Sequence, residues 1–235
     1  MIRILKALAK AFTPQRCAYC DDVIFPQDLM CEECAASLPR IEGEICTRCG
    51  REKDECSCDG EKYYSMLAAP FYYEGVVRKG LHIFKFRHGQ QNSGAYCLEM
   101  AETFSERFAA EDFDYIVGVP MTKKSIRKRG YNQVRLLAKG LSECVNIPYR
   151  EDVLIKLYET RPQHGISYLF RKGNLTGVFD VGNSDAVRGK KILLCDDIST
   201  SGETFNECAK MLWLNGAEKV CCICLALTKS KKKDK

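Results

Sequence analysis

The chain has 235 residues, of which 46% are hydrophobic and 29% are charged. This composition is typical of a globular protein and excludes a disordered, collagen-like or coiled-coil chain. The net charge of +5 does not by itself indicate nucleic-acid binding, because residues 229–235 contain five Lys and one Asp and so contribute +4. A short basic tail of this kind is usually a solvated element.

The N-terminal segment resembles an export signal only in its basic start. Lys6 and Lys10 interrupt its apolar part, and no small-residue cleavage site follows. No apolar run in the sequence approaches the roughly 18 residues that a membrane span needs. We therefore expect a cytoplasmic protein with no membrane span.

Eight of the 15 cysteines fall in pairs within residues 17–58. The first four are spaced C-x2-C, ten residues, C-x2-C, which lets two turns present four thiolates to one zinc ion. The second four, C-x2-C, six residues, C-x-C, are spaced more tightly and predict a second site. Disulfides are the alternative, which a reducing cytosol disfavours. The predicted zinc ligands are Cys17, Cys20, Cys31 and Cys34, and then Cys46, Cys49, Cys56 and Cys58.

From Tyr63 onward, strand-like and helix-like segments alternate. Such alternation predicts an α/β fold, with a parallel sheet covered by helices on both faces. Ligands of such sheets bind at the carboxyl ends of the strands, so the loops that start at Pro120 and Asp196 are the expected sites. We expect strands at 66–73, 114–119, 153–157, 190–195 and 219–227, and helices at 75–86, 96–108, 132–145 and 202–215.

A strongly basic segment follows Pro120, and we expect it to form a loop. Residues 121–135 hold six Lys or Arg and no acid. Like charges at this density repel each other, so they need either an anion or open water.

The sequence from Asp196 to Thr204 carries the clearest chemistry. A buried strand delivers two adjacent carboxylates, and a small hydroxylated turn with one glycine then opens a helix. The N–H groups of such a turn can enclose a phosphate, whereas the acids suit sugar hydroxyls or a metal. The combination indicates a phosphorylated ribose. An ordinary helix cap would explain one or two of these residues, but not the whole run.

These residues resemble the phosphoribosyl-pyrophosphate signature of type I phosphoribosyltransferases. Residues 15–228 as a whole resemble the ComF family, the competence-associated branch of that superfamily. Ser201 and Glu203 depart from the superfamily pattern, but we expect both to be tolerated because the turn works largely through its backbone. Further matching fragments are Tyr73–Gly75, Lys85, Val117–Pro120, Arg129–Gln133, Thr160 with Gln163, Arg171 with Asn174, and Gly177–Phe179.

The resemblance implies a role for each of these segments. Asp196 and Asp197 are implied as the catalytic pair, contacting the ribose hydroxyls directly or through Mg²⁺. The basic segment is implied as the pyrophosphate loop and residues 158–172 as a mobile cover, with an ordinary polar connection as the alternative. The implied binding residues are Ile198, Ser199, Thr200, Ser201, Gly202, Glu203 and Thr204 for the 5′-phosphate, Pro120, Met121, Thr122, Lys123, Arg127 and Arg129 for pyrophosphate, and Arg161, Gln163 and Arg171 in the cover.

Two hypotheses of function follow. The first is a Mg²⁺-dependent enzyme that transfers phosphoribosyl from phosphoribosyl pyrophosphate to a nitrogenous base or related acceptor, linked by resemblance to DNA uptake or nucleotide metabolism. The second is a sensor that uses the same pocket and binds single-stranded nucleic acid or a competence helicase. The expected domains are 1–60, an N-terminal helix with the zinc module, and 61–228, the phosphoribosyltransferase domain, followed by the basic tail 229–235.

Overall fold

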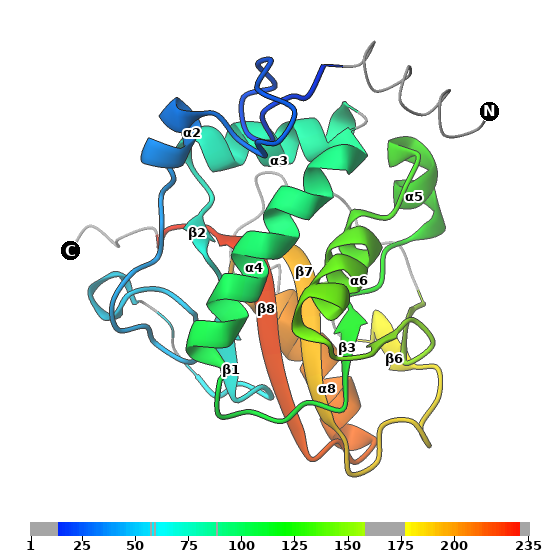
Figure 1. Ribbon diagram of the computed structural model, residues 1–235. Coiled ribbons are helices and arrows are strands. Elements are labelled where there is room, and N and C mark those ends of the chain that lie inside the picture. Colours follow the sequence, from blue (N-terminus) through cyan, green and yellow to red (C-terminus); the bar gives the residue numbers. More distant parts are fainter. Residues whose placement is uncertain (1–13, 57, 59, 88, 158–176, 231–235) are drawn as a thin grey trace.

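The computed structural model describes residues 14–56, 58, 60–87, 89–157 and 177–230. At its centre is one parallel sheet in the order β1-β8-β7-β3-β4, with β2 also paired to β8 (Figure 1). The expected parallel α/β sheet is therefore confirmed, and the segment expected at 66–73 forms two short strands. The strands are β1 (Met66–Ala68), β2 (Phe71–Tyr72), β3 (Tyr115–Gly118), β4 (Tyr149–Arg150), β7 (Lys191–Ser199) and β8 (Lys219–Leu227).

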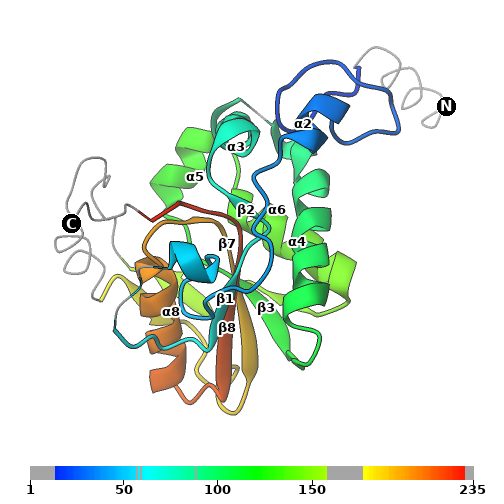
Figure 2. The same ribbon diagram turned by 90° about the vertical axis from the view of Figure 1, so that its left-hand side faces the viewer.

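Helices cover both faces of the sheet, as expected. The helices α3, α4 and α6 lie on one face and α8 lies on the other (Figures 1 and 2). Within the described residues, no helix is long and apolar enough to cross a membrane. The helices are α2 (Glu32–Ala36), α3 (Gly75–Phe86), α4 (Ser93–Arg107), α5 (Lys123–Arg129), α6 (Gln133–Val145) and α8 (Glu203–Leu214), with short 3-10 turns η1 (Lys53–Glu55) and η2 (Gly89–Asn92).

The strands β7 and β8 are buried on both faces, because successive side chains of a strand point to opposite sides. On β7, Ile192 and Leu194 belong to the core that packs against α8. Leu193 and Cys195 belong to the core that packs against α4 and α6. The side chains of β8 divide in the same way. Two-sided burial explains why both strands read as nearly continuous apolar runs in the sequence.

The strand β7 is longer than expected, and its extra length places the two aspartates. It continues beyond Cys195 to Ser199 in parallel register with β8, with Asp196 opposite Cys224 and Ile198 opposite Ala226. Asp196 and Asp197 therefore lie within the strand and not in a loop. Pairing with β8 fixes the backbone from which both carboxylates project.

The basic segment after Pro120 is a helix, so the prediction of a loop was wrong. The Thr122 hydroxyl caps α5 by accepting a hydrogen bond from the Ser125 N–H at 3.1 Å. The helix ends at Gly130, whose φ of 81° places it in the left-handed conformation that glycine adopts readily. Lys and Arg are good helix formers, so the local sequence favours a short helix although the charge pattern suggested a loop.

A small antiparallel pair stands beside the main sheet. It consists of β5 (Leu154–Lys156) and β6 (Phe179–Val181). The strand expected at 153–157 is thus present as β5. The proposed cover that connects the two strands, with Arg161, Gln163 and Arg171, lies outside the described residues.

The segment with the first four cysteines packs against the helices through Ala18 and Tyr19, although Val23 and Phe25 are exposed. Tyr19 is fully buried, with its ring centroid 6.2 Å from that of Phe71 and 5.5 Å from that of Tyr96. The carbonyl of Ala18 accepts hydrogen bonds from the Tyr96 hydroxyl at 2.6 Å and from the Asn92 amide at 3.2 Å. The aromatic contacts make this segment part of the core on the α4 side of the sheet.

Gly80 of α3 permits this contact, and we predict that Gly80→Ala weakens the fold. A Cβ atom at Gly80 would lie 2.8 Å from the Ala18 carbonyl oxygen and 2.9 Å from the Tyr19 Cα. Because both are backbone atoms, the segment must move away from the helix. Such overpacking typically costs about 1–3 kcal/mol, which urea unfolding will measure. Gly94→Ala in α4, where the added atom meets nothing within 4 Å, is the control and should not lower stability.

Candidate functional site

The ends of β3 and β7 meet at one edge of the sheet. Gly118 is opposite Cys195 in the parallel register, and the Val119 N–H donates to the Cys195 carbonyl at 2.9 Å. The chain leaves β3 at this point toward α5, while β7 continues into Asp196. The basic segment and the aspartate pair, about 70 residues apart in sequence, are therefore neighbours in the structure.

The two carboxylates differ in environment. Asp197 is 7% exposed, and its Oδ1 forms an ion pair with Lys85 Nζ of α3 at 2.8 Å. Asp196 Oδ1 accepts the Asp197 N–H at 2.7 Å. Burial and the neighbouring Asp197 carboxylate raise the pKa of Asp196 to about 7, although Lys85 acts in the opposite direction. A cation bound here would lower this pKa and favour the fully ionised pair.

The chain between β7 and α8, which we name the β7–α8 turn (residues 200–202), leaves its backbone N–H groups unpaired. Within the described part of the chain, the N–H groups of Thr200, Ser201 and Gly202 have no acceptor, and the residues are exposed, half-buried and buried in that order. Gly202 has a φ of 78° and is the N-cap residue of α8. Free N–H groups at the start of a helix form a binding site for anions.

Glu203 would place a negative charge at this turn, but a lysine neutralises it. Its Oε1 pairs with Lys62 Nζ at 2.9 Å, and the two side chains are only 3% and 7% exposed. The N–H of the next residue, Tyr63, donates to Asn206 Oδ1 at 2.9 Å. The segment that precedes β1 therefore contacts the first turn of α8 through both residues. The sequence analysis did not identify Lys62, because no local motif pairs residues 141 positions apart.

Breaking this ion pair should cost stability, because one buried charge would remain alone. We predict that Lys62→Met lowers the free energy of unfolding by about 3 kcal/mol. The double variant Lys62→Met with Glu203→Leu should regain most of the loss, because no unpaired charge is left. Urea unfolding of both variants will measure this, and equal losses in the single and double variants would contradict the prediction.

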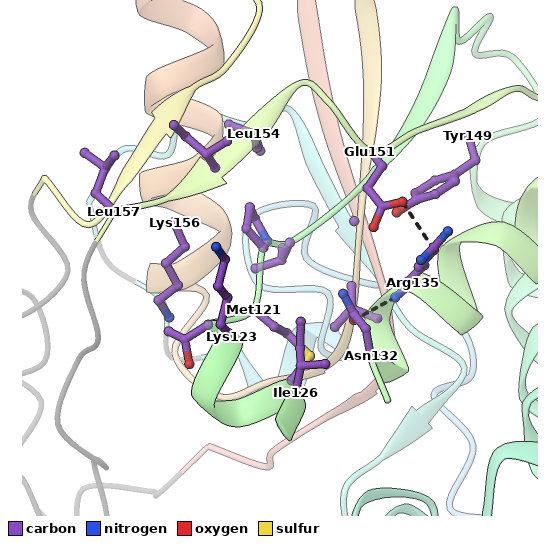
Figure 3. Close-up of a pocket in the computed structure, with 16 residues that line it drawn as sticks. Met121, Lys123, Ile126, Asn132, Arg135, Tyr149, Glu151, Leu154, Lys156 and Leu157 are labelled. Carbon is purple, nitrogen blue, oxygen red and sulfur yellow. Dashed lines mark hydrogen bonds and ion pairs between the residues drawn. The ribbon is translucent and has the colours of Figure 1, made fainter. Parts of the chain in front are cut away.

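A cavity of about 560 Å³ lies beside the start of α5. It is bounded by the end of β3, by α5 and α6, and by β4 and β5 (Figure 3). Figure 3 shows the side chains of Lys123 and Lys156 on one side of it and the Arg135–Glu151 ion pair, at 3.2 Å, on the other. Pro120, Met121 and Thr122 also line the cavity. Four of the six residues predicted to bind pyrophosphate, Pro120 to Lys123, thus line this cavity, whereas Asp196 and Asp197 do not.

Two further cations of α5, Arg127 and Lys128, are exposed like Lys123. No carboxylate of the described chain lies within ion-pair distance of these three side chains. The Arg129 guanidinium carbon lies 5.7 Å from the ring centroid of Phe86, which is 53% exposed. Lys123, Arg127 and Lys128 therefore present positive charge at the end of the sheet where β3 and β7 meet.

The eight paired cysteines form two compact clusters. The thiol sulfurs of each predicted quartet lie within 4.8 Å of one another. Cys20 and Cys31 sulfurs are 3.7 Å apart, and those of Cys46 and Cys58 are 3.6 Å apart. A tetrahedral zinc with Zn–S bonds of 2.3 Å requires sulfurs about 3.8 Å apart, so both clusters fit this ion.

Backbone N–H groups are directed at the thiols, as a thiolate site requires. The Cys31 N–H lies 3.4 Å from the Cys17 sulfur. Although burial opposes the change, backbone hydrogen bonds lower the pKa of Cys17 to about 7. The same balance lowers the pKa of Cys46 to about 6, whereas burial raises that of Cys34 and Cys58. A bound cation would be needed to ionise all four thiols of a cluster.

Comparison with family profiles divides the chain into two matched regions. Residues 8–63 match the double zinc ribbon domain, and residues 124–235 match the phosphoribosyl transferase domain. Among solved structures, the allosteric regulatory enzyme of purine biosynthesis overlaps 56% of this chain and 26% of its own, at 23% identity and a TM-score of 0.37.

Comparison with curated proteins identifies relatives along most of the chain. The DNA utilization protein YhgH of Salmonella typhimurium is 33% identical over 216 residues, which cover 90% of each chain. The competence protein ComFC of Bacillus subtilis is 28% identical over 204 residues, covering 81% of this chain and 80% of the relative. The competence protein F of Haemophilus influenzae is 33% identical over 106 residues, covering 45% and 46%. The chain therefore belongs to the ComF family, the family of ComFC and YhgH, with a phosphoribosyl transferase domain and an N-terminal double zinc ribbon.

Proposed function

We propose that this protein is a Mg²⁺-dependent phosphoribosyltransferase that binds phosphoribosyl pyrophosphate and transfers its phosphoribosyl group to a nitrogenous base. One observation carries the proposal: the ends of β3 and β7 bring a basic helix, an aspartate pair and an unbonded turn together at one sheet edge. The turn suits the 5′-phosphate of the substrate, the aspartate pair suits its ribose hydroxyls, and the basic helix suits its pyrophosphate. Two relatives are named as a competence protein and a DNA utilization protein, which supports a role for this chemistry in one of these processes.

In this proposal, the β7–α8 turn binds the 5′-phosphate through its N–H groups. The hydroxyls of Ser199, Thr200, Ser201 and Thr204 add donors, and the α8 dipole favours the anion. Glu203 does not repel the phosphate because Lys62 neutralises it. Ile198 contributes only its backbone, since it sits in the strand register opposite Ala226.

Asp196 and Asp197 would hold the ribose through its 2′ and 3′ hydroxyls. A carboxylate accepts two such hydrogen bonds, and β7 fixes the direction in which both groups project. The raised pKa of Asp196 and the ion pair of Asp197 with Lys85 indicate that the pair is adapted to a cationic neighbour. The two carboxylates therefore fit Mg²⁺, which would neutralise the departing pyrophosphate when it is bound with the substrate.

Breaking the bond at the ribose anomeric carbon develops negative charge on pyrophosphate. Fixed cations near that group stabilise the transition state more than the ground state. Lys123, Arg127 and Arg129 of α5 would supply this charge, with Pro120, Met121 and Thr122 shaping the start of the helix. Arg161, Gln163 and Arg171 would close over the reactants as a cover.

Several further assignments follow from the same proposal. The zinc module and N-terminal helix would comprise residues 1–60, the catalytic domain 61–228 and the basic tail 229–235. Zinc-bound thiolates and a phosphorylated metabolite both suit the reducing cytosol, so we assign the protein there.

The test of this function is pyrophosphate release. Purified protein with phosphoribosyl pyrophosphate, millimolar Mg²⁺ and a panel of nucleobases should release pyrophosphate with at least one base and form the matching nucleotide. Binding of phosphoribosyl pyrophosphate without release for any base would contradict the enzyme and favour a sensor.

An exposed aromatic favours a second candidate function. Phe86 lies between His82, at a centroid distance of 5.0 Å, and Arg129. Single-stranded nucleic acids bind by stacking bases on aromatic rings flanked by cations. The protein would then use its pocket as a sensor and contact single-stranded nucleic acid or a helicase partner through Lys79, Lys85, Arg87, α5 and the tail. Salt-dependent oligonucleotide binding that survives Asp196→Asn with Asp197→Asn would favour this candidate.

A further inference from the structure

Arg51 connects the second cysteine quartet to the β7–α8 turn. It lies two residues after Cys49 and is 7% exposed. Its Nη2 donates to the Thr200 carbonyl at 2.6 Å and its Nε donates to the Thr228 carbonyl at 2.7 Å. No carboxylate of the described chain lies within ion-pair distance of it. The buried guanidinium thus bonds only to backbone carbonyls of segments that are distant in sequence. Figure 2 shows the connection between β7 and α8 beside the light-blue segment that carries the quartet.

The bond to Thr200 determines how the turn faces its ligand. A peptide unit is planar and trans, so a carbonyl and the N–H of the next residue point in opposite directions. With the Thr200 carbonyl directed at Arg51, the Ser201 N–H is directed away from the zinc module. The Thr228 hydroxyl donates to the same carbonyl at 3.2 Å. The orientation of the Ser201 N–H is therefore held from behind by two donors.

The backbone of Arg51 is in turn held by the metal-binding loop. The Cys46 N–H donates to the Arg51 carbonyl at 2.8 Å, and the Gly50 N–H donates to the Cys46 carbonyl at 2.7 Å. Gly50 sits against the sheet, where a Cβ atom would lie 2.8 Å from the Leu67 carbonyl oxygen. The backbone of Arg51 therefore belongs to the loop of the predicted zinc ligands, while its side chain reaches the turn.

We propose that Arg51 is a positioning residue that makes the sugar-phosphate affinity of the β7–α8 turn depend on metal occupancy of the second cysteine quartet. The inference rests on the proposed function, because it assigns the turn to the 5′-phosphate. Metal bound by the quartet orders the loop, the loop fixes Arg51, and Arg51 fixes the Thr200 carbonyl. The zinc ribbon then contributes to ligand affinity by positioning the β7–α8 turn.

The experiment measures Arg51→Lys and Arg51→Gln by calorimetry with two probes. Lysine keeps the charge but lacks the planar fork that reaches both carbonyls. Affinity for ribose 5-phosphate should fall by about 10- to 100-fold, the effect of one or two hydrogen bonds from a charged donor. Affinity for inorganic pyrophosphate should not change, because that probe binds at α5. This split separates positioning from a general loss of structure.

Arg40→Gln is the matched control. Arg40 also lies in the N-terminal module, where it forms a two-pronged ion pair with Glu99 of α4 at 2.9 and 3.3 Å. Its loss should destabilise the protein but leave ribose 5-phosphate affinity unchanged. Unchanged affinity in both Arg51 variants, equal losses in the Arg40 variant, or parallel losses for both probes would each overturn the proposal.

A second measurement needs no ligand and so separates this inference from the proposed function. The Thr228 N–H donates to the Ser199 carbonyl at 3.1 Å, and the Asn206 N–H donates to the Gly202 carbonyl at 2.9 Å. Hydrogen exchange at both amides should accelerate by at least about tenfold in Arg51→Lys and in Cys58→Ser. The double variant should exchange no faster than Cys58→Ser, because both changes interrupt one connection. Additive effects would show that the metal site and Arg51 act separately.

Discussion

Asp196→Asn combined with Asp197→Asn should lower the rate of pyrophosphate release at least about a hundredfold, close to 3 kcal/mol of transition-state stabilisation. Both changes keep the size of the side chain and remove its charge. The ribose hydroxyls would lose their strongest acceptors, and the site would lose the negative charge that attracts Mg²⁺. The rate is measured at saturating phosphoribosyl pyrophosphate and again at low concentration, so that binding and turnover are separated.

Asp114→Asn is the control for this prediction. Asp114 stands just before β3, at the opposite end of the sheet, where its carboxylate accepts from Lys190 at 2.7 Å and from the Lys191 N–H at 2.9 Å. The variant loses an ion pair and should lose some stability, but its rate of release should match that of the wild type. A double aspartate variant as active as Asp114→Asn would remove Asp196 and Asp197 from the chemistry.

Removing the metal should have the second large effect. We expect two zinc ions per chain, and stripping them with a strong chelator under reducing conditions should lower the melting temperature by at least about 10 °C. The first quartet holds Tyr19 and Ala18 in the core against Tyr96, so its loss opens the packing of α3 and α4. Affinity for zinc should also fall as the pH falls, because protons compete for the thiolates.

Cys144→Ser provides the matched control for zinc binding. Cys144 is an exposed thiol on α6, outside both quartets. This variant should retain two zinc ions and the wild-type melting temperature, whereas Cys20→Ser should lose one ion. Zinc-free protein with unchanged stability, or disulfides between the paired cysteines, would contradict the account of the N-terminal module.

Sequence reasoning succeeded where local pattern and burial coincide. The strands β7 and β8 are apolar on both faces, so their sequence alone indicated a parallel sheet. The cysteine spacing likewise predicted which four thiols cluster, because a C-x2-C turn brings two sulfurs together whatever surrounds it. Gly75–Phe86 was predicted with its observed bounds, since its apolar stripe has helical periodicity and Arg87 ends it.

Sequence reasoning failed where contacts join distant segments. Arg51 and Lys62 lie in the N-terminal part of the chain and contact residues 149 and 141 positions away, and no spacing rule relates such pairs. The helix α5 was missed because its positive charge suggested open water, whereas a Thr cap and a glycine stop favour a helical turn. The two quartets also differ in a way that sequence does not reveal. The first packs on helices, whereas the second lies against β1 and reaches the β7–α8 turn through Arg51.

Titration of phosphoribosyl pyrophosphate into the holoprotein at millimolar Mg²⁺ tests the central claim most directly, namely that the sheet edge and α5 together form one site. The account predicts saturable heat with one molecule bound per chain, competition by ribose 5-phosphate and by pyrophosphate separately, and loss of the signal in the double aspartate variant. Absence of saturable heat would contradict it. So would binding of ribose 5-phosphate and pyrophosphate that does not compete with phosphoribosyl pyrophosphate.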